Sequence, residues 1–279
     1  GRVSDLSNLN SNSRYKLIIM QNYGLVSIIT PTWACAKFIC ETIYSIQAQT
    51  YQNWELLIQD DCSTDNTYLV VEPLANLDPR IKSQFNEKRS GAAITRNNAL
   101  KRANGRWIAF LDSDDLWLPE KLERQLKFMV QNNYAFTYHE YIEMSEEGND
   151  LGVYVSGKKR VNELDMYICC WPGCLTVMYD MEKIGLIQIK DVCKNNDTAM
   201  WLKVVQKSPC YLLQENLARY RRRAVSITPK PLYKRIWAHY PLFHVAEEMH
   251  PVRATYWVLM NVLGNTFKKI FYVKHYDVE

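Results

Sequence analysis

Strand-like runs alternate with helical segments over the first 115 residues, and this alternation restricts the fold more than any other feature of the sequence. Strands are predicted at 25–30, 54–58, 81–85 and 107–111, and helices at 38–49, from about 65, and at 90–103. Strands separated by helices of about 10–15 residues form βαβ units and pair in parallel. The first half is therefore expected to be a Rossmann-like α/β sheet with helices on both faces.

The second half does not keep this alternation. A helix is expected from Pro119 to Val130, a strand at 135–144, a hairpin or loop at 148–159, a helix at 196–207, and strands at 211–213 and 217–221. From Pro229 onward the pattern predicts helical hairpins without sheet partners. In the first half, Ser63 or Thr64 is expected to cap the helix that begins near Asp65.

The composition is that of an ordinary globular protein, with 279 residues, 47% apolar residues and a net charge of +4. It excludes a collagen-like chain and a small disulfide scaffold. No run approaches the roughly 18–20 uncharged apolar residues that a membrane-spanning helix needs. Residues 1–22 do not begin with basic residues followed by an apolar core, so they are interpreted as a disordered or artificial leader rather than a secretory signal.

The cysteine pattern favours free thiols. Of the eight cysteines, Cys169 and Cys170 are adjacent, Cys35 and Cys40 lie at or near a predicted helix, and no C-x-x-C pair is present. Reduced cysteines are typical of a cytoplasmic protein.

An acidic cluster, Asp112-Ser113-Asp114-Asp115, directly follows the predicted strand at 107–111. Ligands of open α/β sheets bind at the carboxyl ends of the strands. Three carboxylates so close together repel one another unless a cation compensates, and oxygen ligands suit magnesium or manganese. The alternative is a solvated acidic turn ahead of the helix that Pro119 opens.

The strand at 54–58 ends in the same way, with Asp60 and Asp61. A carboxylate here can accept hydrogen bonds from a nucleotide base or ribose, and it can equally form an Asx-turn that caps the next helix. Further along, Gly91 permits a tight turn, and Arg96 can reach a carboxylate or phosphate from the first turns of its helix. The alternative for Arg96 is a surface arginine.

Taken together, these segments resemble the family 2 inverting glycosyltransferases, which have a GT-A fold and often build bacterial surface polysaccharides. The resemblance covers about 25–226. It rests on four motifs in order: V-S-I-I-T-P-T-W (26–33), Q-D-D-C-S-T-D (59–65), G-A-A-I-T-R-N-N-A-L (91–100) and G-R-W-I-A-F-L-D-S-D-D (105–115).

The resemblance implies a donor site for a UDP-sugar and a divalent metal, manganese or magnesium. Its implied residues are Pro31 and Thr32 in the base pocket, Asp61 on the uracil N–H, Arg96 near the diphosphate, Asp112 facing ribose and metal, Ser113 beside it, and Asp114 on the metal. The acceptor would be a glycan or lipid-linked glycan.

A later segment also resembles the family. Asn196-Asp197-x-x-x-Trp201-Leu202 is similar to a Glu-Asp-x-x-x-Trp-Leu helix start whose Asp is the catalytic base, which makes Asp197 the expected base and Asn196 a departure from the usual Glu. The stretch 220–223, Tyr-Arg-Arg-Arg, resembles one that closes over the diphosphate. Arg223 would neutralise charge there rather than bind metal. Without the resemblance, helix capping is the ordinary role for Asp197.

The tail is basic, with 11 Lys and Arg against 4 acids between 219 and 279, while the rest of the chain carries −3. An apolar set recurs at helical steps: Val252, Tyr256, Leu259, Leu263, Phe267 and Ile270. This pattern is compatible with a helical cap packed on the catalytic domain and with a docking surface for an anionic membrane.

The sequence therefore predicts a leader at 1–22, a GT-A domain at 23–228 and a basic amphipathic helical tail at 229–279. The expected protein is a glycosyltransferase that uses a UDP-sugar and a lipid-linked acceptor at the inner face of the cytoplasmic membrane, with peripheral contact through the tail. One alternative is a sugar nucleotidyltransferase, although the glycine-rich loop of that class is absent after the first strand. The other is a nucleic-acid-binding module that uses the basic tail, although the basic residues surround apolar helices, so no nucleic-acid partner is expected.

Overall fold

The computed structural model describes residues 22–278 except 193 and 224–231, and side chains at 232–236 are not described. The predicted leader, apart from Asn22, lies outside these residues. The strands are β1 (Val26–Thr32), β2 (Trp54–Asp60), β3 (Ile81–Phe85), β4 (Trp107–Phe110), β5 (Leu116–Trp117), β6 (Phe136–Met144), β7 (Asp150–Val155), β8 (Arg160–Val161), β9 (Met178–Asp180), β10 (Cys210–Arg221) and β11 (Val273–His275).

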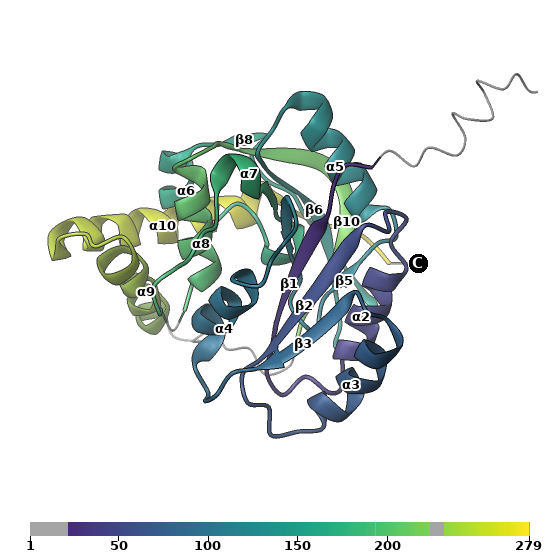
Figure 1. Cartoon of the computed structure of the whole chain (residues 1–279). Coiled ribbons are helices and arrows are strands. Elements are labelled where there is room, and N and C mark those ends of the chain that lie inside the picture. The colour runs from purple at the N-terminus through teal and green to yellow at the C-terminus, as the bar shows by residue number, and fades with distance from the viewer. Residues whose placement is uncertain (1–21, 193, 224–231, 279) are drawn as a thin grey trace, which may run out of the picture.

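The helices flank the sheet that these strands form (Figure 1). They are α2 (Ile39–Gln47), α3 (Thr67–Leu77), α4 (Gly91–Leu100), α5 (Lys121–Asn132), α6 (Glu163–Ile168), α7 (Met181–Ile184), α8 (Asn196–Val205), α9 (Leu232–Pro241) and α10 (Pro251–Phe271), with a 3-10 turn η1 (Cys174–Thr176) and a π-helical turn η2 (Leu242–Ala246).

The described strands form one mixed sheet in the order β11-β7-β6-β9-β4-β1-β2-β3, with β10 pairing with β5, β6 and β8. Strands β4, β1, β2 and β3 are parallel, as predicted. The side chains of β1, β2 and β4 are buried on both faces of the sheet, whereas the edge strand β3 is mostly exposed. Val26 and Ile28 pack in one apolar cluster with residues of α2, α3 and α5, whereas Ile29 and Leu57 pack in a second cluster with residues of α4 and α8.

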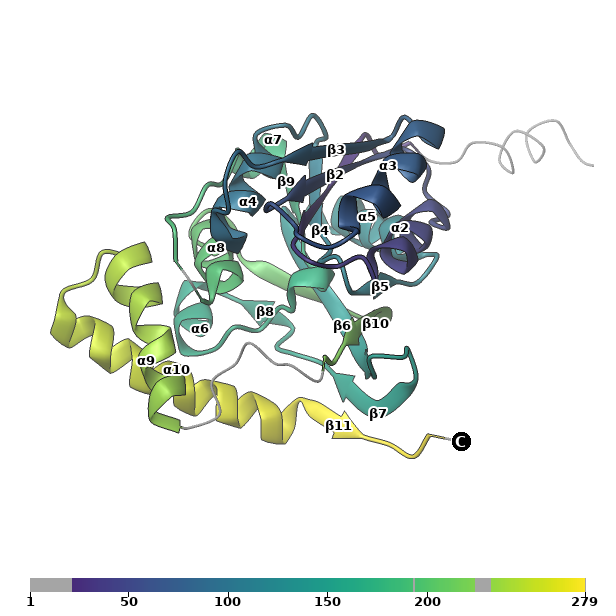
Figure 2. The same ribbon diagram turned by 90° about the horizontal axis from the view of Figure 1, so that it is seen from below.

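The second half extends this core. Apolar residues of η2 and α10, including Phe243 and Val258, belong to the same cluster as Ile29 and Phe110. Figure 2 shows α10 as a long helix that ends in β11 next to β7. The expectation that the tail has no sheet partner is wrong at its end, because Val273–His275 pairs antiparallel with β7.

Local expectations also need correction. Helix α3 begins at Thr67 after Asn66, so neither Ser63 nor Thr64 caps it. The Ser63 hydroxyl instead donates to Asp60 and accepts from the Ala34 N–H. The two strands expected at 211–213 and 217–221 are one strand, β10, whose pairing with β6 shifts register twice.

The helix expected from Pro119 begins two residues later, in α5, because the short strand β5 precedes it and pairs with β10.

None of the described helices is both long and apolar enough to cross a membrane. The seven described cysteines form no disulfide.

Candidate active site

The carboxyl ends of β1, β2 and β4 are adjacent because these three strands are neighbours and parallel. The Asp61 N–H donates to the Thr32 carbonyl at 2.9 Å, and the Leu111 N–H donates to the Ile29 carbonyl at 3.1 Å. The structure thus brings the predicted residues Pro31, Thr32 and Asp61 to the same sheet edge as the cluster at 112–115.

Asp61 is buried and holds the start of α4. Its carboxylate accepts the Ser90 N–H at 2.6 Å, the Gly91 N–H at 2.8 Å and the Asn86 side-chain amide at 2.8 Å. Burial alone would raise the pKa of Asp61, but these hydrogen bonds outweigh it and lower the pKa below its usual value. A carboxylate has about four acceptor positions, so a further donor can still be accommodated.

Arg96 connects the acidic cluster to the start of α8. This buried guanidinium donates to Asp112 at 3.1 Å and to the side-chain oxygen of Asn196, and it lies 3.6 Å from the Cys174 sulfur. The surface-arginine alternative is therefore wrong. Asn196, the position at which the chain departs from the usual Glu, serves as a neutral partner for Arg96.

The remaining acidic residues contact the end of β10. The Arg221 N–H donates to the buried Asp115 carboxylate at 2.8 Å, and the Arg221 side chain donates to the Asp114 carbonyl at 2.8 Å. Arg223 is exposed and lies 3.5 Å from the Asp114 carboxylate. Ser113 is buried, and its carbonyl accepts from the Cys35 thiol.

Arg221 is a residue that the sequence reasoning did not single out. Its guanidinium is 1% exposed, donates to Glu41 at 2.6 Å and to the Glu146 carbonyl at 2.7 Å, and packs on the Phe38 ring. The stretch of three arginines at 221–223 was visible in the sequence, but nothing in it distinguishes the buried member from the exposed ones.

The acidic cluster is electrostatically strained. Burial, followed by the nearby Asp112 carboxylate, raises the pKa of Asp114. Burial, followed by Asp114 and Asp112, raises the pKa of Asp115 well above its usual value. Carboxylates that resist ionisation in this way are stabilised as anions by a cation. The solvated-turn alternative does not fit Asp115, which is 1% exposed.

The acidic cluster at 112–115 offers only oxygen ligands, which suit a hard divalent cation. Asp112 and Asp114 are the candidate ligands. Within the part of the chain that the structure describes, no group of three Asp, Glu, His or Cys side chains is arranged to hold a metal ion. A metal at this edge would therefore share its coordination between the protein and the oxygens of a bound diphosphate.

Asp197 lies in the first turn of α8 and lines a pocket of about 480 Å³. Its carboxylate accepts the Thr198 N–H at 2.7 Å. This bond is within the first turn of the helix. The residue before α8, Asn195, has a left-handed backbone (φ 56°) and donates its side-chain amide to the Ala238 carbonyl at 3.0 Å, but its side chain makes no capping hydrogen bond to the helix. Asp197 therefore satisfies one N–H of the first turn, as a capping residue does, and it also lines the pocket.

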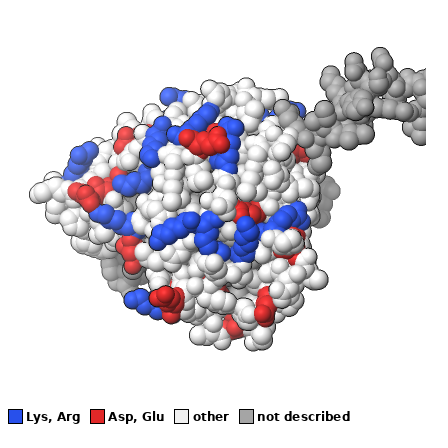
Figure 3. All heavy atoms as spheres, viewed as in Figure 1, with Lys and Arg blue, Asp and Glu red and all other residues white. Residues whose placement is uncertain are grey.

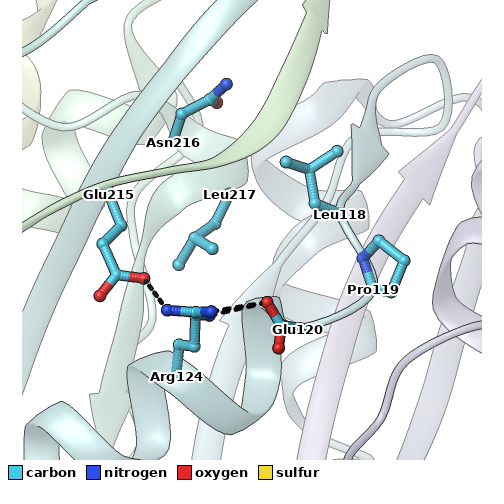
Figure 4. A pocket seen from close by; sticks show the side chains of 7 residues that line it. All are labelled: Leu118, Pro119, Glu120, Arg124, Glu215, Asn216 and Leu217. Carbon is cyan, nitrogen blue, oxygen red and sulfur yellow. Dashed lines mark hydrogen bonds and ion pairs between the residues drawn. The ribbon is translucent and has the colours of Figure 1, made fainter.

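A second pocket of similar volume lies between α5 and β10, and Figure 4 shows its lining. None of the predicted site residues lines it. Its one cation, Arg124, is already paired with Glu120 at 2.8 Å and Glu215 at 3.1 Å. This pocket is thus separate from the acidic site.

Parallel strands with a D-x-D cluster at their carboxyl ends, and a carboxylate on a neighbouring helix, are the arrangement of the GT-A glycosyltransferases. The profile described as "Glycosyl transferase family 2" matches residues 27–165. The chain belongs to glycosyltransferase family 2. This assignment favours glycosyl transfer over both alternatives, the nucleotidyltransferase and the nucleic-acid-binding module.

The relatives support this assignment. The chain is 37% identical over 248 residues to TuaG of Bacillus subtilis (strain 168), provisionally named as a teichuronic acid biosynthesis glycosyltransferase, covering 88% of this chain and 97% of TuaG. It is 42% identical over 187 residues to WfgD of Escherichia coli, named as a UDP-Glc:alpha-D-GlcNAc-diphosphoundecaprenol beta-1,3-glucosyltransferase, covering 67% and 72%. The structure of S. aureus TarS residues 1–349 with UDP-GlcNAc has a TM-score of 0.63 at 20% identity, covering 88% and 74%, which shows the fold.

Proposed function

We propose that this glycosyltransferase transfers a sugar from a UDP-sugar, with inversion, to a hydroxyl of a lipid-linked bacterial surface glycan. The observation that carries the proposal is the Arg96 bridge, because it fixes Asp112 of the donor edge next to Asn196, the residue before Asp197. In a displacement reaction the sugar donor and the acceptor hydroxyl must be bound next to each other, so the residues that bind them must also be close together.

The reaction is one in-line displacement. The acceptor oxygen bonds to the anomeric carbon, while the bond from that carbon to the diphosphate oxygen breaks and UDP leaves with the electron pair. Asp197 takes the acceptor's hydroxyl proton. Because the attack comes from the side opposite the leaving group, the configuration inverts.

Asp112 and Asp114 would hold a manganese or magnesium ion, which would stabilise the negative charge of the leaving diphosphate. The raised pKa of Asp114 supports a cation there, since burial and Asp112 both disfavour its ionised form. Arg223, 3.5 Å from Asp114, would add positive charge on the same side.

The nucleotide would lie along β1 and β2. Pro31 and Thr32 would line the base pocket, Asp61 would accept the uracil N–H, and Ser113 would contact the donor. The Thr32 hydroxyl is buried and has no hydrogen-bond partner among the described residues, so it is available to a ligand. UDP and UDP-GlcNAc complexes of TarS support a uridine nucleotide.

The proposed acceptor is inferred from the name of a relative, and the proposed membrane location from the exposed apolar face of α10. WfgD is named for a diphosphoundecaprenol-linked acceptor, and such a lipid resides in the membrane. We propose that α10 contacts the cytoplasmic face of that membrane with an exposed apolar set that includes Leu259, Leu263 and Ile270, at 53%, 65% and 66% exposure.

The first test measures UDP release from a panel of UDP-sugars with a lipid-linked acceptor, before and after chelation of metals. We expect activity to vanish with EDTA and to return with manganese or magnesium. Asp114→Asn should lose more activity than Asp115→Asn, because only Asp114 is a proposed ligand. Full turnover in a metal-stripped enzyme would refute the metal site.

The second test compares UDP with CDP by calorimetry. Uracil presents an N–H to Asp61, whereas cytosine presents an acceptor at the same position. In a CDP complex the Asp61 carboxylate would face this acceptor without a hydrogen bond, so UDP should bind more tightly. Equal affinities would argue against the proposed role of Asp61.

A further inference from the structure

The pocket beside Asp197 is lined mainly by three helices, together with Cys170 and Asn195 from the segments between helices. Asp197 and Thr198 come from α8, His239 from α9, and a polar strip of α10 supplies Asn265, Thr266 and Lys269. Its volume of about 480 Å³ is within the range of small-molecule sites and is large enough for a monosaccharide. Helix α10 thus forms one wall of the pocket that contains the proposed base.

Helix α10 has one buried face and one exposed apolar face. The buried face consists of Ala254, Val258, Asn261 and Gly264, at helical steps of four and three. Leu263, Phe267 and Ile270 are exposed, at 65%, 48% and 66%. The polar strip lies between these two faces, so the α10 wall of the pocket borders the exposed apolar face.

Lys269 is the cation of this polar strip. It is exposed, and among the residues that the structure describes no carboxylate pairs with its ammonium group. The neighbouring Lys268 differs, because it donates to the carbonyls of Cys170 and Trp171 at 3.0 Å and 2.6 Å. Lys269 is therefore available to an anion, and Asp197 in the same pocket is available to a hydroxyl.

We propose that α10 is the acceptor-binding helix and that its polar strip binds a polyprenyl diphosphate-linked sugar. Lys269 contacts the diphosphate, the sugar enters the pocket toward Asp197, and the polyprenyl chain leaves along the apolar face. This placement explains why one helix carries a polar strip directly beside an exposed apolar face. It rests on the proposed glycosyl transfer and adds the residues that select the acceptor.

The experiment measures binding without requiring the acceptor sugar to be known. Farnesyl diphosphate, farnesyl monophosphate and farnesol are titrated into the full chain by calorimetry, without vesicles and with manganese, once without UDP and once with saturating UDP. Because saturating UDP fills the donor site, the diphosphate probe reports the pocket alone. Vesicle-free conditions exclude a phospholipid headgroup as the partner of Lys269.

The variant is Lys269→Met, and Arg253→Met on the same helix is its matched control. Lys269 is exposed, so its attraction to phosphate is partly screened, and we expect about three- to tenfold weaker farnesyl diphosphate binding. Farnesol binding and the control should be unchanged. Thr266→Phe, which fills the pocket, should weaken all three probes.

Three outcomes would overturn the proposal: equal effects of Lys269→Met and Arg253→Met, equal affinities for farnesol and farnesyl diphosphate, or loss of probe binding when UDP is added. UDP binding measured in the same samples tests the donor site separately. A chain that binds UDP and not farnesyl diphosphate would refute this inference alone, whereas a chain that fails to bind UDP would refute the proposed function.

Discussion

Asp61 and Asp197 are both acidic residues near helix starts, but their carboxylates have different surroundings. Asp61 is buried and accepts hydrogen bonds from two backbone N–H groups and one amide. Asp197 accepts the N–H of its neighbour Thr198 and lines a pocket. The Asp61 carboxylate is held by three protein donors and still has acceptor capacity for a ligand, whereas the Asp197 carboxylate accepts one backbone N–H and lines the pocket. The two residues should therefore respond differently to the same Asp→Asn change.

Asp61→Asn is expected to destabilise the fold in a pH-dependent way. Its pKa is lowered in the folded state, so its carboxylate contributes stability above the unfolded pKa of about 3.9, and this contribution is lost as the pH falls toward the folded value. Urea unfolding should show a loss of about 1–3 kcal/mol at pH 7 and a smaller loss near pH 3. Asp277→Asn, at an exposed site, is the control. A loss of the same size at both pH values would contradict this role.

Asp197→Asn should leave the fold intact and remove the proposed base. Asn substitutes well for Asp near a helix start, so the melting temperature should hardly change. The transfer rate should fall by roughly 10²–10⁴-fold, because the amide cannot take the acceptor's proton. UDP affinity should stay the same. A folded variant with near-normal transfer would mean that another residue is the base.

At the scale of elements, α10 shows how periodicity alone can be misread. The apolar set at 252, 256, 259, 263, 267 and 270 is the strongest pattern in the tail, and packing on the domain was one interpretation of it. In the structure this set is exposed, and the helix packs through Ala254, Val258, Asn261 and Gly264. Small residues such as Ala254 and Gly264 allow the helix to lie close to its neighbours, and a pattern of large apolar residues does not indicate such a face.

Gly264→Ala should therefore displace α10 from α6. A Cβ at this position would lie 2.1 Å from the Ile168 carbonyl oxygen and 2.7 Å from its side chain, so the backbone must shift. We expect a loss of about 1–3 kcal/mol in urea unfolding, the usual cost of overpacking. Transfer to a lipid-linked acceptor should fall more than UDP binding. Leu259→Ala, on the exposed face, should change stability little, and equal stability of both variants would refute the close contact.

The sequence predicts the parallel half of the sheet well, because buried strands and the helices between them have distinct patterns. It also predicts that Asp61 and Asp112 share an edge. It does not predict β11 or β5, whose two or three residues carry no alternation and pair only because other strands are in place. The burial of Arg96 and Arg221 also depends on residues about 100 or more positions away, such as Asn196 and Glu41.

At the scale of the whole molecule, the basic tail is part of the catalytic fold. Apolar residues of η2 and α10 share a core with the central sheet. On the face shown in Figure 3, basic side chains are interspersed with acidic ones. Membrane attachment would therefore depend on the apolar face of α10 together with nearby cations, and this combination gives affinity that depends on both lipid charge and salt.

Vesicle binding tests this arrangement. The full chain should co-sediment with phosphatidylcholine vesicles that contain phosphatidylglycerol, and less so at high salt, because surface charges are screened. Replacing Leu259, Leu263 and Phe267 with Ser should weaken binding by at least about tenfold, since these side chains would otherwise be buried in lipid.

A matched control replaces Leu69, Leu77 and Phe85 with Ser. These are two leucines and a phenylalanine of comparable exposure, on α3 and β3. If the two triple variants lose vesicle binding equally, or if neither does, then α10 is not the membrane-contacting element. UDP affinity should be unchanged in the α10 variant, because that face is opposite the one through which the helix joins the core. A selective loss of vesicle binding would mean that a single helix contacts the membrane on one face while the other holds it to the catalytic domain.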